Sequence, residues 1–251
     1  MISIYSPVPS RLIIGLMISL MLFSMSLEAK EINQDTNEQQ AVENYLMGKF
    51  NPATHKAFVK IPKRFANRSG YYLRKEAFDA YTKMYDAARK DGVNLVIRSA
   101  TRNFNYQKSI WERKWRAQKK SRSPKSKALN ILSLSSMPGT SRHHWGTEID
   151  LNAFNNTWFE SGKGLKLFNW LNENAVKYGF NRPYTKKDAQ RPSGYNEEKW
   201  HWSYTPLSIP MVRDAKLALK DKKITGFLGS NTAQQIGVVK NYVLGIDKCC
   251  L

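Results

Sequence analysis

Histidine is scarce in this chain, and its placement limits the folds that the chain can adopt. Three of the four histidines fall in two short segments, residues 141–150 and 198–201, and both segments also carry carboxylates. Two imidazoles and a carboxylate form a donor set typical of catalytic zinc, which takes three nitrogen or oxygen ligands from the protein and leaves a fourth position open. A fold that uses this set must bring two segments about fifty residues apart to one place.

The first segment supplies one imidazole and one carboxylate. His143 and Asp150 are seven residues apart, with a glycine between them. That spacing is too long for neighbouring turns of one helix face, so we expect a glycine-assisted turn that leads into a strand at about 149–151. His144 and Glu148 are further candidate ligands. A His–Asp pair alone could equally be a structural hydrogen bond.

The second segment, Glu-Lys-Trp-His, favours a metal site over a structural hydrogen bond. His201 completes a set of two histidines and one aspartate, and Glu198 then lies beside the metal. Because zinc lowers the pKa of water to near neutrality, a carboxylate at this position can act as the general base of a hydrolase. Glu197 is the alternative base. Trp200 and Trp202 are expected to pack around the site.

The net charge of +20 indicates an anionic partner: nucleic acid, an acidic membrane surface or an anionic cell-wall polymer. Residues 12–25 form an apolar stretch after Arg11, short for a membrane span of about 20 residues and typical of a secretory signal. We therefore expect a signal peptide over residues 1–29, with an uncleaved anchor as the alternative. The protein would be exported to the periplasm or cell envelope, with no stable membrane span after cleavage. Export argues against a nucleic-acid partner.

Both cysteines lie at the C-terminal end, as the neighbours Cys249 and Cys250. Adjacent cysteines rarely form a disulfide with each other, because the geometry is strained. We assign them no function. The metal site must therefore be built without thiolate ligands.

The alternation of predicted helices and strands indicates a mixed α+β domain at about 46–205. A polar linker, or a frayed first helix, is expected at 30–45 and a helical C-terminal extension at 206–251. The spacing of apolar residues and the positions of glycine and proline predict the elements. Helices are expected at 76–91, 106–118 and 164–178, helical stretches at 210–220 and 231–244, and strands at 93–99 and 200–204.

Residues 112–127 form a dense basic run in which half of the residues are Lys or Arg. A Ser-Pro pair interrupts the run, so we expect it to leave the preceding helix as an exposed loop. One interpretation is a solvated surface. The other is an electrostatic tether to anionic envelope polymers, since opposite charge raises local concentration in a salt-dependent way.

The two segments together form a pattern that resembles a known family. Ser-x-His-x-x-Gly-x-x-x-Asp at 141–150, followed by Glu-x-Trp-His at 198–201, is similar to the zinc D-alanyl-D-alanine carboxypeptidases and dipeptidases of the vancomycin-resistance type. That group shares its fold with the N-terminal domain of hedgehog proteins and with some phage murein endopeptidases. The resemblance implies a small antiparallel sheet flanked by helices in a zinc peptidase domain at 46–205. It also implies one zinc ion per chain, with the ligands His143, Asp150 and His201 and the general base Glu198.

A third element of the family pattern is Ser-Gly-Tyr-Arg at the end of a strand, with a Gln five residues beyond the Arg. The corresponding run here is Ser-Ala-Thr-Arg at 99–102, so Arg102 and Gln107 match while the Gly and the Tyr do not. The resemblance implies that Arg102 stabilises the oxyanion of peptide hydrolysis. It places Gln107 and Ser141 near bound substrate. A surface salt bridge for Arg102 and a turn cap for Ser141 are the alternatives.

These observations lead to one main hypothesis for the function. The chain is expected to be a zinc-dependent D-alanyl-D-alanine carboxypeptidase that removes the terminal D-Ala from peptidoglycan stem peptides. The alternatives are a murein L-Ala-D-Glu endopeptidase, a D-Ala-D-Ala dipeptidase, or a non-catalytic zinc-stabilised module that binds the envelope.

Overall fold

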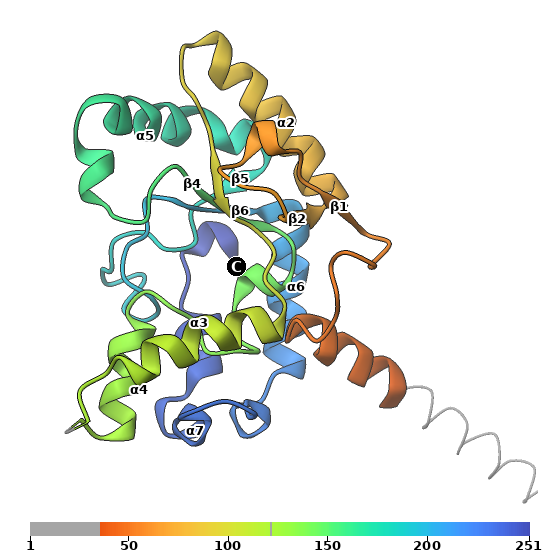
Figure 1. Ribbon diagram of the computed structural model, residues 1–251, viewed down its shortest axis with the longest axis vertical. Coiled ribbons are helices and arrows are strands. Elements are labelled where there is room, and N and C mark those ends of the chain that lie inside the picture. Colours follow the sequence, from red (N-terminus) through yellow and green to blue (C-terminus); the bar gives the residue numbers. More distant parts are fainter. Residues whose placement is uncertain (1–35, 121) are drawn as a thin grey trace, which may run out of the picture. The chain divides into compact units, whose positions relative to one another are not determined.

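The computed structural model describes residues 36–120 and 122–251 (Figure 1). These residues belong to two compact units, one ending at Ala41 and one spanning Val42–Leu251, and the fold below is that of the second unit. The predicted signal peptide at 1–29 lies outside the described residues. Among the residues described, none of the helices combines the length and the apolar character that a membrane crossing needs.

The α+β class predicted from the sequence is confirmed. Residues 36–46, part of the segment expected to be a linker or first helix, are helical. The α-helices that follow are α2 (Lys75–Lys90), α3 (Phe104–Arg116), α4 (Pro124–Leu132), α5 (Gly162–Asn174), α6 (Thr205–Ala218) and α7 (Ala233–Ile236). The strands are β1 (Phe58–Lys60), β2 (Tyr72–Arg74), β3 (Ile97–Ser99), β4 (Glu148–Leu151), β5 (Phe180–Asn181) and β6 (His201–Tyr204).

The central sheet has four antiparallel strands in the order β3-β4-β6-β5, and β1 pairs with β2 in a separate small sheet. In the β4–β6 pair, Asp150 lies opposite His201 and Glu148 lies opposite Ser203. Side chains alternate between the two faces of a strand. These four polar side chains therefore share one face, and Ile149 and its partner in β6 point to the other.

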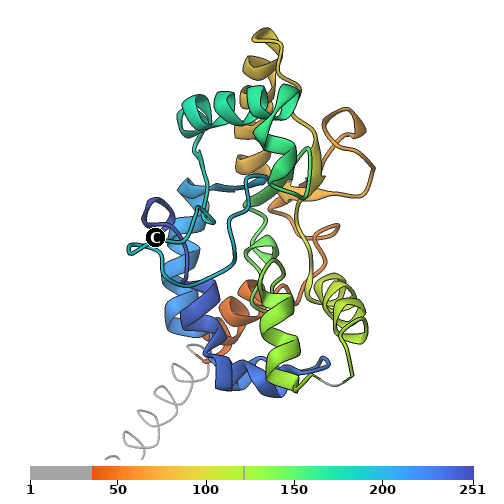
Figure 2. The ribbon, with the colours of Figure 1, turned by 90° about the vertical axis from the view of Figure 1, so that its left-hand side faces the viewer.

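Two hydrophobic cores support this sheet. The first is formed by buried residues of α2, the sheet strands and α5, among them Tyr81, Ile149 and Trp202. The second is formed by buried residues of α3, α4, α6 and the C-terminal segments, among them Trp111 and Val212. In both views of the ribbon, α2 and α5 lie at one end of this unit and α3, α4 and α7 at the other, with the sheet between them (Figures 1 and 2).

Most predicted elements are present with shifted ends. The helix expected at 164–178 is α5 followed by a 3₁₀ turn, Ala175–Tyr178, and it stops at Gly179, whose φ is +80°. The strand expected at 93–99 is shorter, because only β3 forms ladder bonds. The side chain of Asn152 instead binds the segment before β3, accepting from Val96 N and donating to Asn94 O.

The loop predicted over the basic run is confirmed only for the short segment between α3 and α4, which holds Lys119, Lys120 and Arg122. The run lies mostly on two helices, since α3 continues to Arg116 and α4 begins at Pro124. Lys and Arg are good helix formers. The Ser-Pro pair starts a helix: Ser123 caps α4 by accepting a hydrogen bond from Ser126 N, and Pro124 occupies its first turn.

The segment after β6 is helical, as expected. Besides α6 and α7 it contains a π-helical turn, Val239–Val243, within the stretch predicted at 231–244. Its buried residues pack in the second core together with those of α3 and α4. Cys250 is buried there, and Cys249 is exposed; both are free thiols.

Candidate active site and metal centre

Three predicted ligands meet at one point of the structure. Asp150 on β4 and His201 on β6 are cross-strand neighbours, and His143 lies in the 3₁₀ turn Arg142–His144 that precedes β4. One ligand atom from each of the three residues lies within 4.8 Å of the others, and all three residues are buried. The antiparallel register places Asp150 beside His201, and the turn before β4 brings His143 to them.

The turn between His143 and Asp150 depends on Gly146. Its φ is +78°, and a Cβ at this position would lie 2.3 Å from Cε1 of Phe58. The backbone therefore turns here in a conformation that only glycine adopts without strain. The predicted glycine-assisted turn into a strand is confirmed.

Each histidine ligand has its outer nitrogen occupied. Nδ1 of His143 donates to the carbonyl of Ala100 at 2.8 Å, and Nε2 of His201 donates to Oε2 of Glu148 at 2.7 Å. These bonds fix the tautomers, because a carbonyl and an ionised carboxylate can only accept. The inner nitrogens, Nε2 of His143 and Nδ1 of His201, then face Asp150 and are the atoms that a metal would bind.

This arrangement fits a metal ion. Nε2 of His143 lies 3.3 Å from Oδ2 of Asp150, and Nδ1 of His201 lies 3.0 Å from Oδ1. Burial lowers the pKa of His201, but its hydrogen bonds to Asp150 and Glu148 outweigh burial and raise this pKa to about 9, so without a metal a proton occupies Nδ1. A cation bound between the two imidazoles and the carboxylate would replace that proton. The nitrogen and oxygen donors suit zinc.

Glu198 is the carboxylate beside this set. Its Oε2 lies 3.5 Å from His201 Nδ1, and the residue is buried. Burial raises the pKa of the Glu198 carboxyl to about 8, although the charges of His201, Arg102 and Lys114 act in the opposite direction. The alternative base, Glu197, forms an ion pair with Arg182 at 3.3 Å instead.

Glu148 and His144, the alternative ligands, lie outside the cluster of His143, Asp150 and His201. Oε1 of Glu148 accepts from Arg142 at 3.1 Å and from Ser203 at 2.6 Å. These bonds hold the carboxylate so that its Oε2 accepts from the outer nitrogen of His201. Burial opposes ionisation of Glu148, but Arg142 and His201 outweigh it and lower its pKa to about 2. Both ring nitrogens of His144 form hydrogen bonds: Nε2 accepts from Gly139 N, and Nδ1 donates to Arg102 O.

Arg102 lies in the cleft next to the metal set. Its backbone N–H donates to His143 O at 3.1 Å, which fixes the residue beside the ligand. Its charge acts on the buried groups around it: after burial itself, Arg102 is the largest cause that lowers the pKa of His143, to about 4. Neutral imidazole is the form that binds a metal.

Gln107 and Ser141 are fully buried and do not line the cleft. Nε2 of Gln107 donates to the carbonyl of Ser136, a residue that does line it. Ser141 precedes the 3₁₀ turn without making a side-chain cap bond, and its Oγ finds no hydrogen-bond partner among residues 36–120 and 122–251. Gln107 thus supports the cleft wall, and direct contact of either residue with substrate stays a prediction.

The cleft itself has a volume of about 540 Å³. Its lining comes from the segment 67–71, β3, α3, residues 134–136 and the metal segments, so it lies between the two cores. Trp200 packs in the first core, as predicted, and also lines the cleft, where its ring contacts Phe154 edge to face at 6.4 Å. The sequence reasoning missed four cleft residues that carry positive charge: Arg68, Arg98, Arg113 and Lys114.

Comparison with known proteins agrees with this geometry. A family model described as "VanY: D-alanyl-D-alanine carboxypeptidase" matches residues 70–207. The chain therefore belongs to the VanY family of D-alanyl-D-alanine carboxypeptidases, as the sequence motifs predicted.

Individual relatives are more distant. The chain is 33% identical over 128 residues to a D-alanyl-D-alanine carboxypeptidase of Enterococcus faecalis (strain ATCC 700802 / V583), a match that covers 49% of this chain and 45% of that protein. It is 30% identical over 156 residues to the Bacillus subtilis (strain 168) protein YodJ, covering 60% and 53%. The chain thus spans about half the length of the curated relatives it matches.

Solved structures of similar proteins include a variant of the vancomycin-resistance D,D-pentapeptidase VanY in complex with Zn(II). It is 29% identical with a TM-score of 0.45, over 58% of this chain and 82% of that one. VanYB in complex with D-alanine-D-alanine is 23% identical with a TM-score of 0.48, over 77% and 89%.

Proposed function

We propose that the protein is a zinc-dependent D,D-carboxypeptidase that releases the terminal D-alanine from peptidoglycan stem pentapeptides. The observation that carries this proposal is the convergence of His143, Asp150 and His201 within 4.8 Å of one another, beside the buried carboxylate of Glu198. Membership of the VanY family supports the choice of substrate.

The three ligands would hold one zinc ion, which supplies Lewis-acid activation of water and of the scissile carbonyl when bound. Glu198 is placed to take one proton from the attacking water and to pass it to the leaving amine. In the reaction, a bond forms between the water oxygen and the carbonyl carbon, the C–N bond breaks, and free D-alanine leaves with the transferred proton. Arg102 would stabilise the negative charge that develops on the carbonyl oxygen.

The proposal includes the location of the protein. A hydrolase of peptidoglycan peptides acts outside the cytoplasm, which agrees with the secretory signal predicted at 1–29 and with the net charge of +20. The basic run at 112–127 would add attraction to anionic envelope polymers through those of its cations that face away from the cleft.

Product analysis tests the proposal. The purified protein is incubated with a stem pentapeptide that ends in D-Ala-D-Ala, with the corresponding tetrapeptide and with free D-Ala-D-Ala, and the products are read by mass. We expect the pentapeptide to lose a single alanine. Cleavage within the stem would instead indicate the L-Ala-D-Glu endopeptidase, and cleavage of the free dipeptide alone would indicate the dipeptidase. Zinc binding without any cleavage would favour the non-catalytic module.

A further inference from the structure

The cleft carries an excess of positive charge that the hydrolytic mechanism does not require. Outside the metal set and Glu198, its charged lining residues are Arg68, Arg98, Arg102, Arg113 and Lys114. In the described part of the chain, none of these five cations forms an ion pair with a carboxylate. Unpaired cations gathered in a cleft repel one another, and an anionic ligand would relieve the repulsion.

Two of these cations lie close to the reacting groups. Lys114 and Arg102 act electrostatically on Glu198, and burial together with Arg102 and Arg113 lowers the pKa of Lys114. Cations beside the base fit the terminal carboxylate of the substrate, which is one residue beyond the scissile bond. The remaining cations, Arg68, Arg98 and Arg113, lie elsewhere along the lining of the cleft.

Arg68 and Arg98 form one preorganised wall. Arg68 Nε donates to Tyr71 Oη at 2.9 Å, and an Nη of Arg68 donates to Tyr106 Oη at 2.8 Å. The hydroxyl of Tyr71 in turn donates to the backbone carbonyl of Arg98. The guanidinium of Arg98 lies 5.7 Å from the centre of the Phe154 ring, and its buried Nε has no hydrogen-bond partner within the described part of the chain.

The aromatic contacts hold both guanidinium groups without neutralising them. A guanidinium that is fixed by phenols and a ring keeps its charge and loses little conformational entropy when it binds a carboxylate. The wall is therefore suited to a fixed anion on the substrate.

Stem peptides differ in charge near the scissile bond. Their third residue is next to the D-alanine whose carbonyl is attacked, and an extended chain advances only about 3.3–3.6 Å per residue. This third residue is either lysine, with a cationic side chain, or meso-diaminopimelate, whose side chain ends in both an amine and a carboxylate. A lysine side chain would add a sixth cation to the cleft.

We propose that Arg68 and Arg98 bind the side-chain carboxylate of the third stem residue, so that the enzyme prefers diaminopimelate stems to lysine stems. This inference rests on the proposed carboxypeptidase function and specifies its substrate. The enzyme would discriminate by one carboxylate that lies away from the reacting bond.

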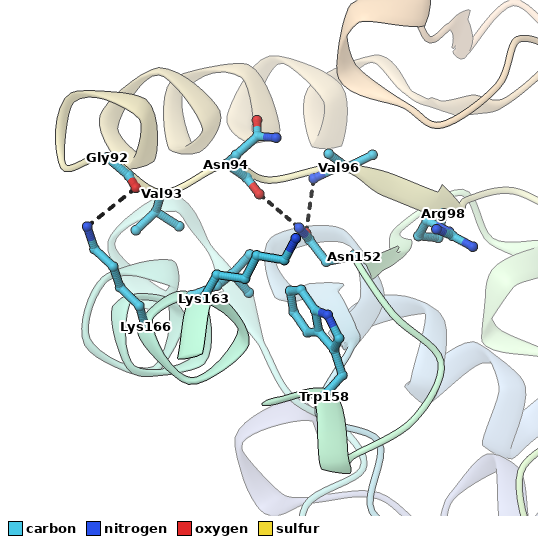
Figure 3. A pocket seen from close by; sticks show the side chains of 10 residues that line it. Gly92, Val93, Asn94, Val96, Arg98, Asn152, Trp158, Lys163 and Lys166 are labelled. Carbon is cyan, nitrogen blue, oxygen red and sulfur yellow. Dashed lines mark hydrogen bonds between the residues drawn. The ribbon is translucent and has the colours of Figure 1, made fainter. Parts of the chain in front are cut away.

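A neighbouring hollow offers a competing position for that carboxylate. Arg98 also lines a cavity of about 390 Å³ together with Lys163, Lys166 and Trp158 (Figure 3). In this view Lys163 extends toward Asn152, and Lys166 donates to the carbonyl of Gly92 at 3.4 Å. Arg68 does not line this hollow, so Arg68 is the residue that distinguishes the two positions.

The experiment compares two pentapeptides that differ only in the third residue, L-Ala-γ-D-Glu-X-D-Ala-D-Ala with X as meso-diaminopimelate or L-lysine. The kcat/KM for D-alanine release is measured for each. We expect a preference of about tenfold or more for diaminopimelate, the size of one charge-assisted hydrogen bond, expressed mainly in KM. The preference should shrink between about 50 mM and 500 mM NaCl, because salt screens the interaction.

Variants then locate the subsite. Arg68→Gln and Arg98→Gln should lower kcat/KM for the diaminopimelate peptide toward that for the lysine peptide, with kcat on the lysine peptide retained. Arg89→Gln is the matched control, since Arg89 is also exposed and lies over a tyrosine ring, that of Tyr85 at 5.8 Å, away from the cleft. Thermal melts of Arg68→Gln confirm folding, which the exposure of this side chain favours.

The outcomes separate the inference from the proposed function. Equal kcat/KM for both peptides, with D-alanine released from each, would overturn the inference and leave the carboxypeptidase intact. A preference that survives Arg68→Gln but disappears in Lys163→Gln would also overturn it and place the carboxylate in the neighbouring hollow. Release from neither peptide would contradict the proposed function itself.

Discussion

His201 shows how a single side chain is prepared to bind a metal. Its Nε2 donates to Glu148, and its Nδ1 is thereby left to face Asp150. The Glu-x-x-His spacing predicted His201 as a ligand, but it did not assign Glu148, which was an alternative ligand on sequence grounds. The pairing of Glu148 with Ser203 across β4 and β6 supports a role for Glu148 behind His201, and a motif this short does not reveal strand register.

The role of Glu148 can be tested through metal affinity. Glu148→Gln should weaken zinc binding about 10-fold to 100-fold, the usual effect of removing a carboxylate that orients a histidine ligand. It should also destabilise the fold by up to about 3–5 kcal/mol, because Arg142 loses its partner in the core. Competition with a coloured chelator measures the affinity. Glu160→Gln, which removes only the partly exposed pair with Lys199, should leave it unchanged.

Glu198 has a separate role that a second substitution isolates. Glu198→Gln should keep zinc bound, since the ligand atoms of His143, Asp150 and His201 are untouched, while D-alanine release falls about 100-fold to 10,000-fold, as expected for loss of a general base. Metal content and turnover are measured on the same sample. Unchanged turnover in this variant would remove Glu198 from the mechanism.

At the scale of elements, the turn at Gly146 connects two ligand segments. Gly146→Ala places a methyl group against the Phe58 ring at a positive φ, so we expect a loss of about 2 kcal/mol or more in the free energy of unfolding, together with weaker zinc binding. Denaturant titration measures the loss. Gly162→Ala is the control: Gly162 also has a positive φ, +52°, but nothing lies within 4 Å of the added methyl group. Equal losses in the two variants would show that backbone strain alone is responsible.

The elements also show where sequence reasoning succeeded and failed. Helix α2 was predicted within one residue at each end, because its apolar residues recur regularly and a glycine follows it. Helix α4 was missed because Ser123-Pro124 was interpreted as an interruption, although the same pair is a common start of a helix. The prediction gave more weight to the density of positive charge than to the Ser-Pro capping signal, whereas in the structure Ser123 caps a helix.

At the scale of the whole molecule, the motifs predicted the cluster of His143, Asp150 and His201 but not the cleft around it. The ligands were predictable because zinc chemistry limits which residue types can meet. The cations Arg68, Arg98 and Lys114 belong to segments far apart in the sequence, and only the packing of the two cores places them along one cleft. Long-range packing of this kind leaves no local signal.

The measurement that tests the central claim most directly is zinc titration of the metal-depleted full chain, with D-alanine release from the stem pentapeptide as the readout. We predict that chelation abolishes release and that added zinc restores it, with the rate levelling off at about one equivalent, since His143, Asp150 and His201 form the one such set among the described residues. Release that persists in metal-depleted protein, or that stays absent with one zinc bound at this set, would contradict the account.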